Sequence, residues 1–317
     1  MDPVDAMDEA RALELRQERE ALRTSLGRVG VWSFALETHA AADERREAVD
    51  IEAMGYPAIW IPEAVDSREA FSHASWLLAS TERATIATGI ANIWARDATA
   101  AANGARMLAD AYPGRFVLGI GVSHRGSVAS RGAEYRLPYT RMREYLDEMD
   151  RAESTAPEPT VQPRIMLAAL GPRMLELAAE RTHGAHPYFV PVEHTAFARA
   201  RLGPEPVLAV EQTVVLETDP GSARRIARRF AADYLDSPNY ANNLRRMGYT
   251  AADVSGQGSD RVVDAVIAWG DVDRIASRVR EHVQAGADHV CLQVVSDDEE
   301  DVGVGELRDL ADAVLDR

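Results

Sequence analysis

The sequence predicts an α/β protein of the (β/α)8 barrel class (a TIM barrel), and three observations support this fold. Short apolar runs alternate with amphipathic segments along most of the 317 residues, a pattern typical of parallel βαβ units. There are eight such runs, the number of strands that closes this barrel. The first run ends in Gly30-Val31-Trp32-Ser33 and lacks the glycine fingerprint of an open dinucleotide-binding sheet.

The predicted strands are short, rich in β-branched and aromatic residues, and bounded by Gly, Pro or charged residues. They cover residues 28–33, 58–62, 84–91, 115–121, 164–169, 184–190, 211–217 and 289–295. Between them, helices are predicted over residues 40–54, 69–79, 97–111, 141–152, 172–182 and 271–286. In the last of these segments, apolar residues recur every three or four positions, as they do on one face of a helix.

Two connections are longer than a plain barrel needs and are predicted to be insertions near the active site. They follow strand 4, over residues 122–163, and strand 7, over residues 218–288. Residues 1–26 are mostly polar and charged, and they are predicted to form an N-terminal helical extension outside the barrel. No linker divides residues 27–317, so they are predicted to form a single domain.

Composition excludes several kinds of chemistry. All 35 cationic side chains are Arg, against 51 Asp and Glu, and the net charge is −16. The absence of Lys excludes a Schiff-base lysine and a P-loop lysine. The acidic excess argues against nucleic acid or a membrane surface as a partner. No apolar run is long enough for a transmembrane helix and no signal peptide is apparent, so a cytoplasmic location is expected.

Cysteine and histidine usage gives no sign of a metal site. Cys291 is the single cysteine, so neither an internal disulfide nor a multi-cysteine zinc site is possible. Three histidines, His183, His186 and His194, lie close together in the sequence, but no HExxH pattern or carboxylate-rich ligand set accompanies them. We therefore predict no metal.

Chemistry in a barrel is carried by residues at the carboxyl ends of the strands. Glu63 follows the second predicted strand and His124 the fourth, and both side chains could donate or accept a proton. These two are the candidate catalytic residues. Each also has a plainer interpretation, as a solvated loop carboxylate and a surface histidine.

Glycines at strand ends indicate a place where backbone closely approaches a ligand. Gly121 and Gly171 would allow N–H groups to reach a phosphate or a flat ring, although either glycine could simply form a turn. Gly171-Pro172 also begins a predicted helix, whose first turn offers unpaired N–H groups to an anion.

Five segments of the chain resemble the bacterial luciferase-like superfamily, and most closely its oxidoreductases that use the deazaflavin coenzyme F420. These segments are residues 55–63, 87–92, 115–124, 170–175 and 285–290. The resemblance extends over about residues 27–317. It implies a barrel that binds a cofactor at its C-terminal mouth, a small-molecule substrate and a homodimer. It also implies a non-proline cis peptide bond between Gly89 and Ile90, against which the cofactor ring would lie.

The resemblance and the strand-end positions together name the candidate cofactor-binding residues. They are Gly89, Ile90, Asn92, Gly121, Val122, Ser123, Ala169, Leu170, Gly171, Pro172 and His186. Three functions remain open. The first is hydride transfer between F420 and a small organic substrate, with F420 as the cofactor. The second is a monooxygenase that uses reduced FMN to activate O₂. The third is an F420- or flavin-binding protein without turnover. In the family's sugar-phosphate dehydrogenases a histidine follows the acid after strand 2, whereas here Ala64 follows Glu63.

Overall fold

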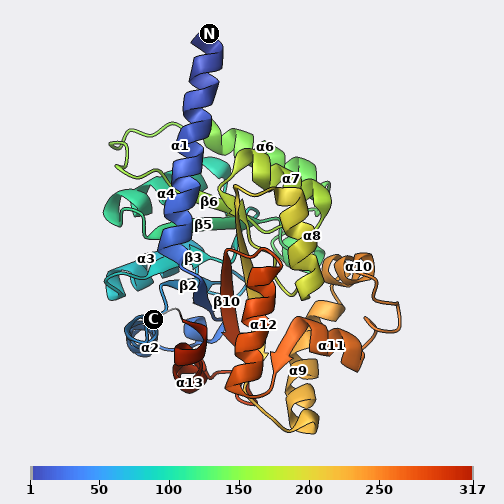
Figure 1. The fold of residues 1–317 in the computed structure, drawn as a ribbon. Helices are drawn as coiled ribbons and strands as arrows, with labels where there is room; N and C mark the ends of the chain where they lie inside the picture. The colour runs from blue at the N-terminus through green and yellow to red at the C-terminus, as the bar shows by residue number, and fades with distance from the viewer. Residues whose placement is uncertain (1–2, 316–317) are drawn as a thin grey trace.

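The computed structural model describes residues 3–315, with side chains from residue 12 onward, and it confirms the closed barrel (Figure 1). Eight parallel strands form the barrel wall. They are β1 (Val29–Trp32), β2 (Ala58–Ile61), β3 (Thr85–Thr88), β5 (Phe116–Gly121), β6 (Arg164–Leu167), β7 (Gly184–Ala185), β8 (Val207–Val215) and β10 (His289–Val294). β10 pairs with β8 on one side and with β1 on the other, which closes the barrel.

Two further short strands lie at the C-terminal end of the barrel. β4 (Ala91–Asn92) pairs with β5, and β9 (Ile267–Trp269) pairs with the last residues of β8. The strand predicted over residues 84–91 is therefore interrupted at Gly89 and Ile90, and β9 was not predicted. These additions extend the barrel wall on the side where strands end, which is where a site is expected.

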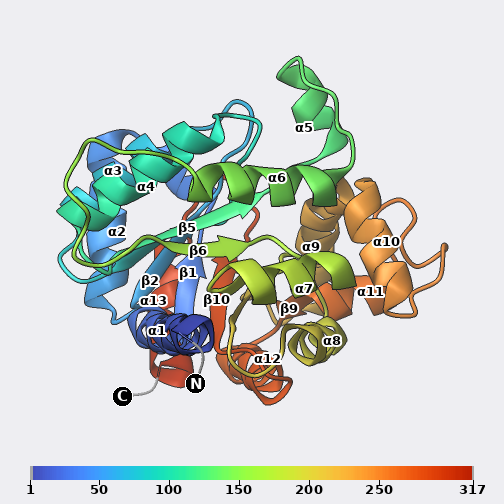
Figure 2. The ribbon, with the colours of Figure 1, turned by 90° about the horizontal axis from the view of Figure 1, so that it is seen from above.

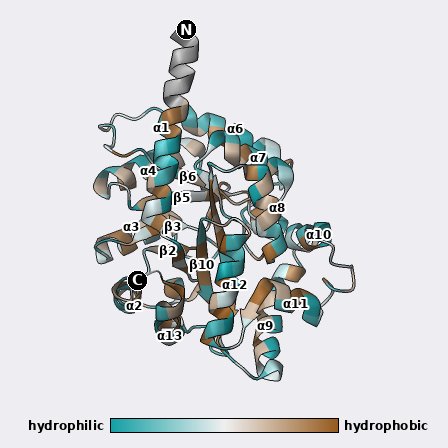
Figure 3. Cartoon of the chain, in the orientation of Figure 1, coloured by the Kyte–Doolittle hydropathy of each residue, from teal (hydrophilic) through white to brown (hydrophobic). Residues whose placement is uncertain are grey.

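Helices surround the barrel and bury their apolar faces against the strands. They are α2 (Ala41–Ala53), α3 (Ala70–Ser80), α4 (Ala98–Ala111), α6 (Pro138–Asp150), α7 (Pro172–Arg181), α8 (Val192–Leu202), α12 (Val272–Gln284) and α13 (Val304–Val314). The strands are mainly apolar in colour in Figure 3, whereas the helices mix apolar and polar residues. α12 shows how the sequence sets a helix start: the side chain of Asp271 accepts a hydrogen bond from the Arg274 amide.

The two long connections fold into helices. The segment after β5 contains α5 (Arg125–Ser130) and α6, and the segment after β8 contains α9 (Pro220–Leu235), α10 (Pro238–Arg246), α11 (Asp260–Val266) and α12. A short 3-10 helix, η1 (Ala35–Thr38), follows β1. Residues of α9, α10 and α11 form an apolar cluster of their own that includes Phe189 and Trp269. The barrel thus carries a second layer of packing beside its mouth.

Helix α1 (Pro3–Leu26) is more than an appendage. Its N-terminal part projects away from the barrel in Figure 1, but its last turns close the barrel's N-terminal end. Leu22 and Leu26 are fully buried and cluster with residues of the barrel interior such as Trp60. The guanidinium of Arg19 donates to the carbonyl oxygens of Ala179 and Thr182 at 2.7 and 2.8 Å. The last turns of α1 therefore pack against the barrel at its N-terminal end.

Two strand boundaries also differ from the prediction. The strand expected over residues 184–190 ends at Ala185, because Pro187 has no N–H for a ladder and Phe189 has φ of 54°. The strand expected over residues 211–217 begins earlier, at Val207. No helix in the described part of the chain combines the length and apolar composition needed to cross a membrane.

Candidate active site

The C-terminal mouth of the barrel holds most of the predicted site residues. Figure 2 shows α5, which follows β5, at the end of the barrel opposite α1. The carboxyl ends of the strands thus lie away from the end that α1 covers, and they lead into α5 and into the helices that follow β8.

A close-packed wall forms where β3 ends. The peptide bond between Gly89 and Ile90 is cis, as the resemblance implied. A Cβ atom on Gly89 would lie 2.5 Å from Nε1 of Trp32, and one on Gly121 would lie 2.6 Å from Cδ1 of Ile90. At such distances a side chain at either position would force its neighbours to shift. These glycines bring backbone and the Ile90 side chain together into one surface at the mouth.

Buried polar atoms without a partner face this part of the mouth. Among the described residues, none forms a hydrogen bond with Nε1 of Trp32 or with Nε2 of His186. Both atoms lie against Gly89, because its Cβ position would be 2.5 Å from the first and 3.2 Å from the second. Buried polar groups are nearly always paired, so two unpaired ones at one point are an exception within this barrel.

The protonation state of His186 follows from its surroundings. Its ring stacks on Trp60, with centroids 4.3 Å apart, and its Nδ1 lies 3.0 Å from the carbonyl oxygen of Ala209. Burial lowers the pKa of His186 to about 4, so the ring is neutral at physiological pH. Nδ1 must then carry the proton it donates to Ala209, which leaves Nε2 as an acceptor and Trp32 Nε1–H as a donor.

Glu63 is part of a buried ion pair rather than a free acid. Its Oε2 accepts hydrogen bonds from the Asn92 amide at 2.7 Å and from Nη1 of Arg96 at 2.9 Å, and its Oε1 bonds Nη2 of the same Arg96. The Glu63 side chain is 3% exposed. Arg96 also bonds the more exposed Glu69 at 2.9 Å. Sequence reasoning missed Arg96, although its place just after β4 and before α4 was a usable signal.

His124 lies on the other side of the wall, at the end of β5. Ser123 has φ of 57° and turns the chain there, and Trp94 donates to the carbonyl oxygen of Val122 at 3.0 Å. Nδ1 of His124 lies 3.1 Å from Oδ1 of Asn239, and its ring contacts Tyr240 at 5.4 Å between centroids. Burial lowers the pKa of His124, so its Nε2 is an unprotonated acceptor at neutral pH.

The start of α7 has the features of an anion site. Gly171 is its N-cap residue, Pro172 occupies the first turn, and no side chain caps the helix. Nη2 of Arg246, from α10, would lie 3.9 Å from a Cβ on Gly171. A helix N-terminus with an arginine beside it can bind a phosphate or carboxylate. His194 holds the preceding residue, Leu170, in place, because its Nε2 lies 2.9 Å from the Leu170 carbonyl oxygen.

An aromatic cluster that the sequence did not reveal forms the wall opposite the glycines. Tyr188 lies against Trp32, with ring centroids 5.0 Å apart, and its hydroxyl is 2.8 Å from that of Tyr234. Tyr240 and Phe189 complete the cluster. Tyr234 and Tyr240 come from α9 and α10, within the long connection after β8, so no strand-end position marked them. Among the described residues, no group of three or more His, Cys, Asp or Glu side chains could hold a metal ion.

The structure thus brings together Gly89, Ile90, Gly121, Asn92 and Glu63, and it places His186 against Gly89. Val122, Ser123 and His124 continue from the same strand end. Ala169, Leu170, Gly171 and Pro172 form the separate anion-type site at α7. Within the described part of the chain, no hydrogen bond joins Glu63 to His124, and the catalytic roles of these two residues remain predictions.

The fold and this mouth together define a (β/α)8-barrel protein with a ligand site at the carboxyl ends of its strands. The sequence profile of the luciferase-like monooxygenase family matches residues 24–289. The chain belongs to this family.

Known proteins of two cofactor types resemble the chain. A Mycobacterium tuberculosis protein named as a coenzyme F420-dependent oxidoreductase is 27% identical, over 77% of this chain and 88% of the relative. The solved structure of an F420-dependent secondary alcohol dehydrogenase, in complex with an F420–acetone adduct, has a TM-score of 0.72. It is 16% identical and covers 91% of this chain and 99% of its own.

The second type is represented by a flavin enzyme. The oxygenating constituent of 3,6-diketocamphane monooxygenase from Pseudomonas putida, in complex with FMN, has a TM-score of 0.63. It is 16% identical and covers 90% of this chain and 95% of its own. At these identities the structural likenesses establish the fold alone.

Proposed function

We propose that the protein is an oxidoreductase that transfers a hydride between coenzyme F420 and a small organic substrate at the C-terminal mouth. The observation that carries the proposal is the surface at Gly89, Ile90 and Gly121, where a Cβ on either glycine would displace its neighbours. A flat ring with polar edges fits such a surface. The F420-dependent relative from Mycobacterium tuberculosis supports this cofactor.

The residues present fit the two parts of this cofactor. When bound, F420 supplies the hydride-carrying ring, and the protein supplies binding, orientation and exclusion of water. We assign the ring to the surface formed by Gly89 and Ile90. We assign the anionic tail to the start of α7, beside Gly171 and Arg246.

Proton handling is proposed for His124, with Glu63 as a positioning residue. His124 is neutral at physiological pH, and the side chain of Asn239 holds its ring through Nδ1. Its Nε2 can therefore accept a proton and return it. Both oxygens of Glu63 are already bonded, so Glu63 acts by holding the Asn92 amide and Arg96 at the mouth.

An anaerobic titration tests the proposal. Purified protein is mixed with F420 or with FMN, and the absorbance and fluorescence of each are followed; we expect F420 to bind more tightly. Addition of a panel of alcohols and ketones should then change the redox state of bound F420. Tight binding of FMN instead, with oxygen uptake that depends on reduced FMN, would establish the monooxygenase alternative. F420 binding without any redox change would establish a binding protein without turnover.

Two further properties are proposed, the first from the family resemblance and the second from the sequence. These are a homodimer and a cytoplasmic location. Sedimentation velocity of the purified chain measures the first, and cell fractionation measures the second.

A further inference from the structure

A chain of hydrogen bonds ends on one amide at the barrel mouth. The hydroxyl groups of Tyr188 and Tyr234 are 2.8 Å apart, and Tyr188 donates to Oε1 of Gln293 at 2.7 Å. Each tyrosine has one hydroxyl proton, so Tyr234 must donate to Tyr188. The carboxamide oxygen of Gln293 is thereby occupied. Among the described residues, none accepts a hydrogen bond from its Nε2.

Gln293 lines a cavity of about 320 Å³ between the end of β1, the end of β10 and helix α9. Gln293 is 4% exposed and belongs to β10 of the barrel wall. Much of the lining is apolar, with Phe34 after β1, Phe230 on α9, and Val294 and Val295 at the end of β10. A fixed N–H donor in an apolar cavity orients a ligand through an acceptor atom.

The charges around this cavity are mainly negative. Asp233, Asp298 and Asp301 line it. Arg229 lines it as well, but Nε of Arg229 bonds Glu299 at 2.9 Å and Nη2 donates to the carbonyl oxygen of Ser296 at 2.7 Å. The guanidinium is thus already neutralised by protein acids. An anionic ligand would meet unfavourable charge here, whereas a neutral one would not.

We propose that this cavity is the substrate site and that it binds neutral carbonyl compounds with an apolar body, with Nε2 of Gln293 donating to the carbonyl oxygen. The role of the ligand as a substrate rests on the proposed function. The binding chemistry of the cavity does not depend on the cofactor. Tyr188 is central to the arrangement, because its ring contacts Trp32 and its hydroxyl holds Gln293. The same side chain thus links the cavity to the Gly89 surface.

A set of matched ligands tests the proposal by calorimetry, with and without F420. The set is 2-tetralone, tetralin, which lacks the carbonyl oxygen, and 2-naphthoate, which is an anion. We expect 2-tetralone to bind more tightly than tetralin and 2-naphthoate not to bind. Gln293→Met removes the donor at similar size and should weaken 2-tetralone binding about 3- to 10-fold, the range expected for one neutral hydrogen bond.

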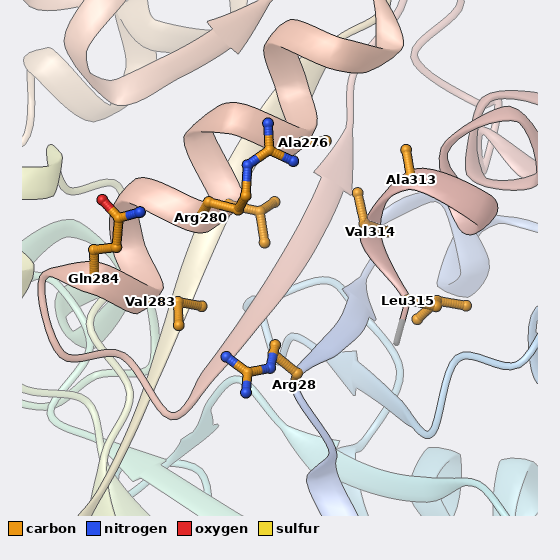
Figure 4. A pocket seen from close by; sticks show the side chains of 9 residues that line it. Arg28, Ala276, Arg280, Val283, Gln284, Ala313, Val314 and Leu315 are labelled. Carbon is orange, nitrogen blue, oxygen red and sulfur yellow. The ribbon is translucent and has the colours of Figure 1, made fainter. Parts of the chain in front are cut away.

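Gln284→Met is the matched control. Gln284 is an exposed residue at the end of α12 and lines a separate cavity of about 230 Å³, together with Arg28 and Arg280 (Figure 4). The control should bind 2-tetralone as the unaltered protein does. The infrared stretching frequency of the carbonyl in bound 2-tetralone provides a readout on the unaltered protein, should Gln293→Met fail to fold. It should fall relative to the same ligand in an apolar solvent.

Equal affinities for 2-tetralone and tetralin, or an unshifted carbonyl frequency, would overturn the inference while leaving F420 binding intact. Binding of 2-tetralone through Gln293 in a protein that does not bind F420 would instead remove the proposed function and keep the carbonyl site. Tight binding of 2-naphthoate would contradict the role of the acidic rim.

Discussion

Glu63 and Arg96 form a bidentate ion pair at the barrel mouth, and the Glu63 carboxylate also accepts a hydrogen bond from the Asn92 amide at 2.7 Å. The pair ties the residue after β2 to the segment that joins β4 to α4. Since the Glu63 side chain is 3% exposed, its charge is shielded from solvent and depends on Arg96 for compensation. A residue first considered for proton transfer thus holds the surface on which the cofactor is proposed to lie.

We predict that Glu63→Gln lowers turnover more than it lowers F420 affinity. The amide keeps the shape of the side chain but loses the charge that orients Arg96, and misplacing a positioning group at the mouth lowers kcat by about 10²-fold. Steady-state kinetics, with F420 affinity measured separately by fluorescence, gives both quantities. Glu69→Gln is the control, because Glu69 bonds the same arginine from a half-exposed position and should change kcat far less. An unchanged turnover number in Glu63→Gln would remove this residue from the mechanism.

Gly89→Ala should reduce cofactor affinity. The added Cβ would lie 2.5 Å from Trp32 Nε1 and 3.2 Å from His186 Nε2, so these side chains or the Gly89 backbone must move, which distorts the surface assigned to the ring. Overpacking of this kind costs about 1–3 kcal/mol, which corresponds to roughly a 5- to 150-fold loss if it falls on binding. Fluorescence titration with F420 measures the affinity. Gly305→Ala, at a position with open space around it, should bind F420 normally; the same affinity in both variants would contradict the assigned surface.

Glu211 gives a prediction about pH and stability. Its carboxylate is buried in the barrel and accepts hydrogen bonds from Oγ1 of Thr213 at 2.7 Å and from the Phe189 amide at 3.0 Å. Burial raises the pKa of Glu211 to about 7. The neutral groups Tyr188, Tyr234, Tyr240 and Cys291 surround it. Because the unfolded chain releases this proton near pH 4.5 and the folded chain near pH 7, the contribution of Glu211 is greatest below pH 4.5 and is lost as the pH rises to 7.

Glu211→Gln should therefore be more stable relative to the unaltered protein at pH 8 than at pH 5. Denaturant unfolding at the two pH values measures the difference in free energy of unfolding between the two proteins. Titratable groups common to both proteins cancel in this difference. A difference that does not change with pH would show that Glu211 titrates normally.

The closing role of α1 predicts which of its leucines matter. Leu22 is fully buried in the barrel interior, whereas Leu13 is 56% exposed on the projecting part of the same helix. Leu22→Ala should lower the free energy of unfolding by about 2–5 kcal/mol, and Leu13→Ala by no more than about 0.5 kcal/mol. Thermal or denaturant unfolding checks both. Equal effects would mean that α1 does not close the barrel in solution.

The single domain predicted over residues 27–317 is tested by limited proteolysis. We expect cleavage in exposed loops to leave the barrel associated and cooperative in unfolding. Release of two separately stable halves would contradict it.

The sequence by itself determined the barrel and the location of its mouth. Eight apolar runs separated by helical periodicity imply parallel strands, and the carboxyl ends of such strands meet at one face, so Glu63, Gly89, Gly121 and Gly171 could be placed there in advance. Two of these glycines, Gly89 and Gly121, stand where a Cβ would displace its neighbours. Composition and local pattern are sufficient for these conclusions because they depend on near neighbours in the chain.

Only the tertiary structure decided which side chains meet across the mouth. Arg96 neutralises Glu63, Tyr188 joins Tyr234 to Gln293, and Leu22 enters the barrel from a helix that reads as a polar extension. The partners in the aromatic network are separated by tens of residues and come from elements of different types. Periodicity reports which face of an element is apolar, but the partner of a polar side chain is set by how distant elements pack, and no local pattern records that.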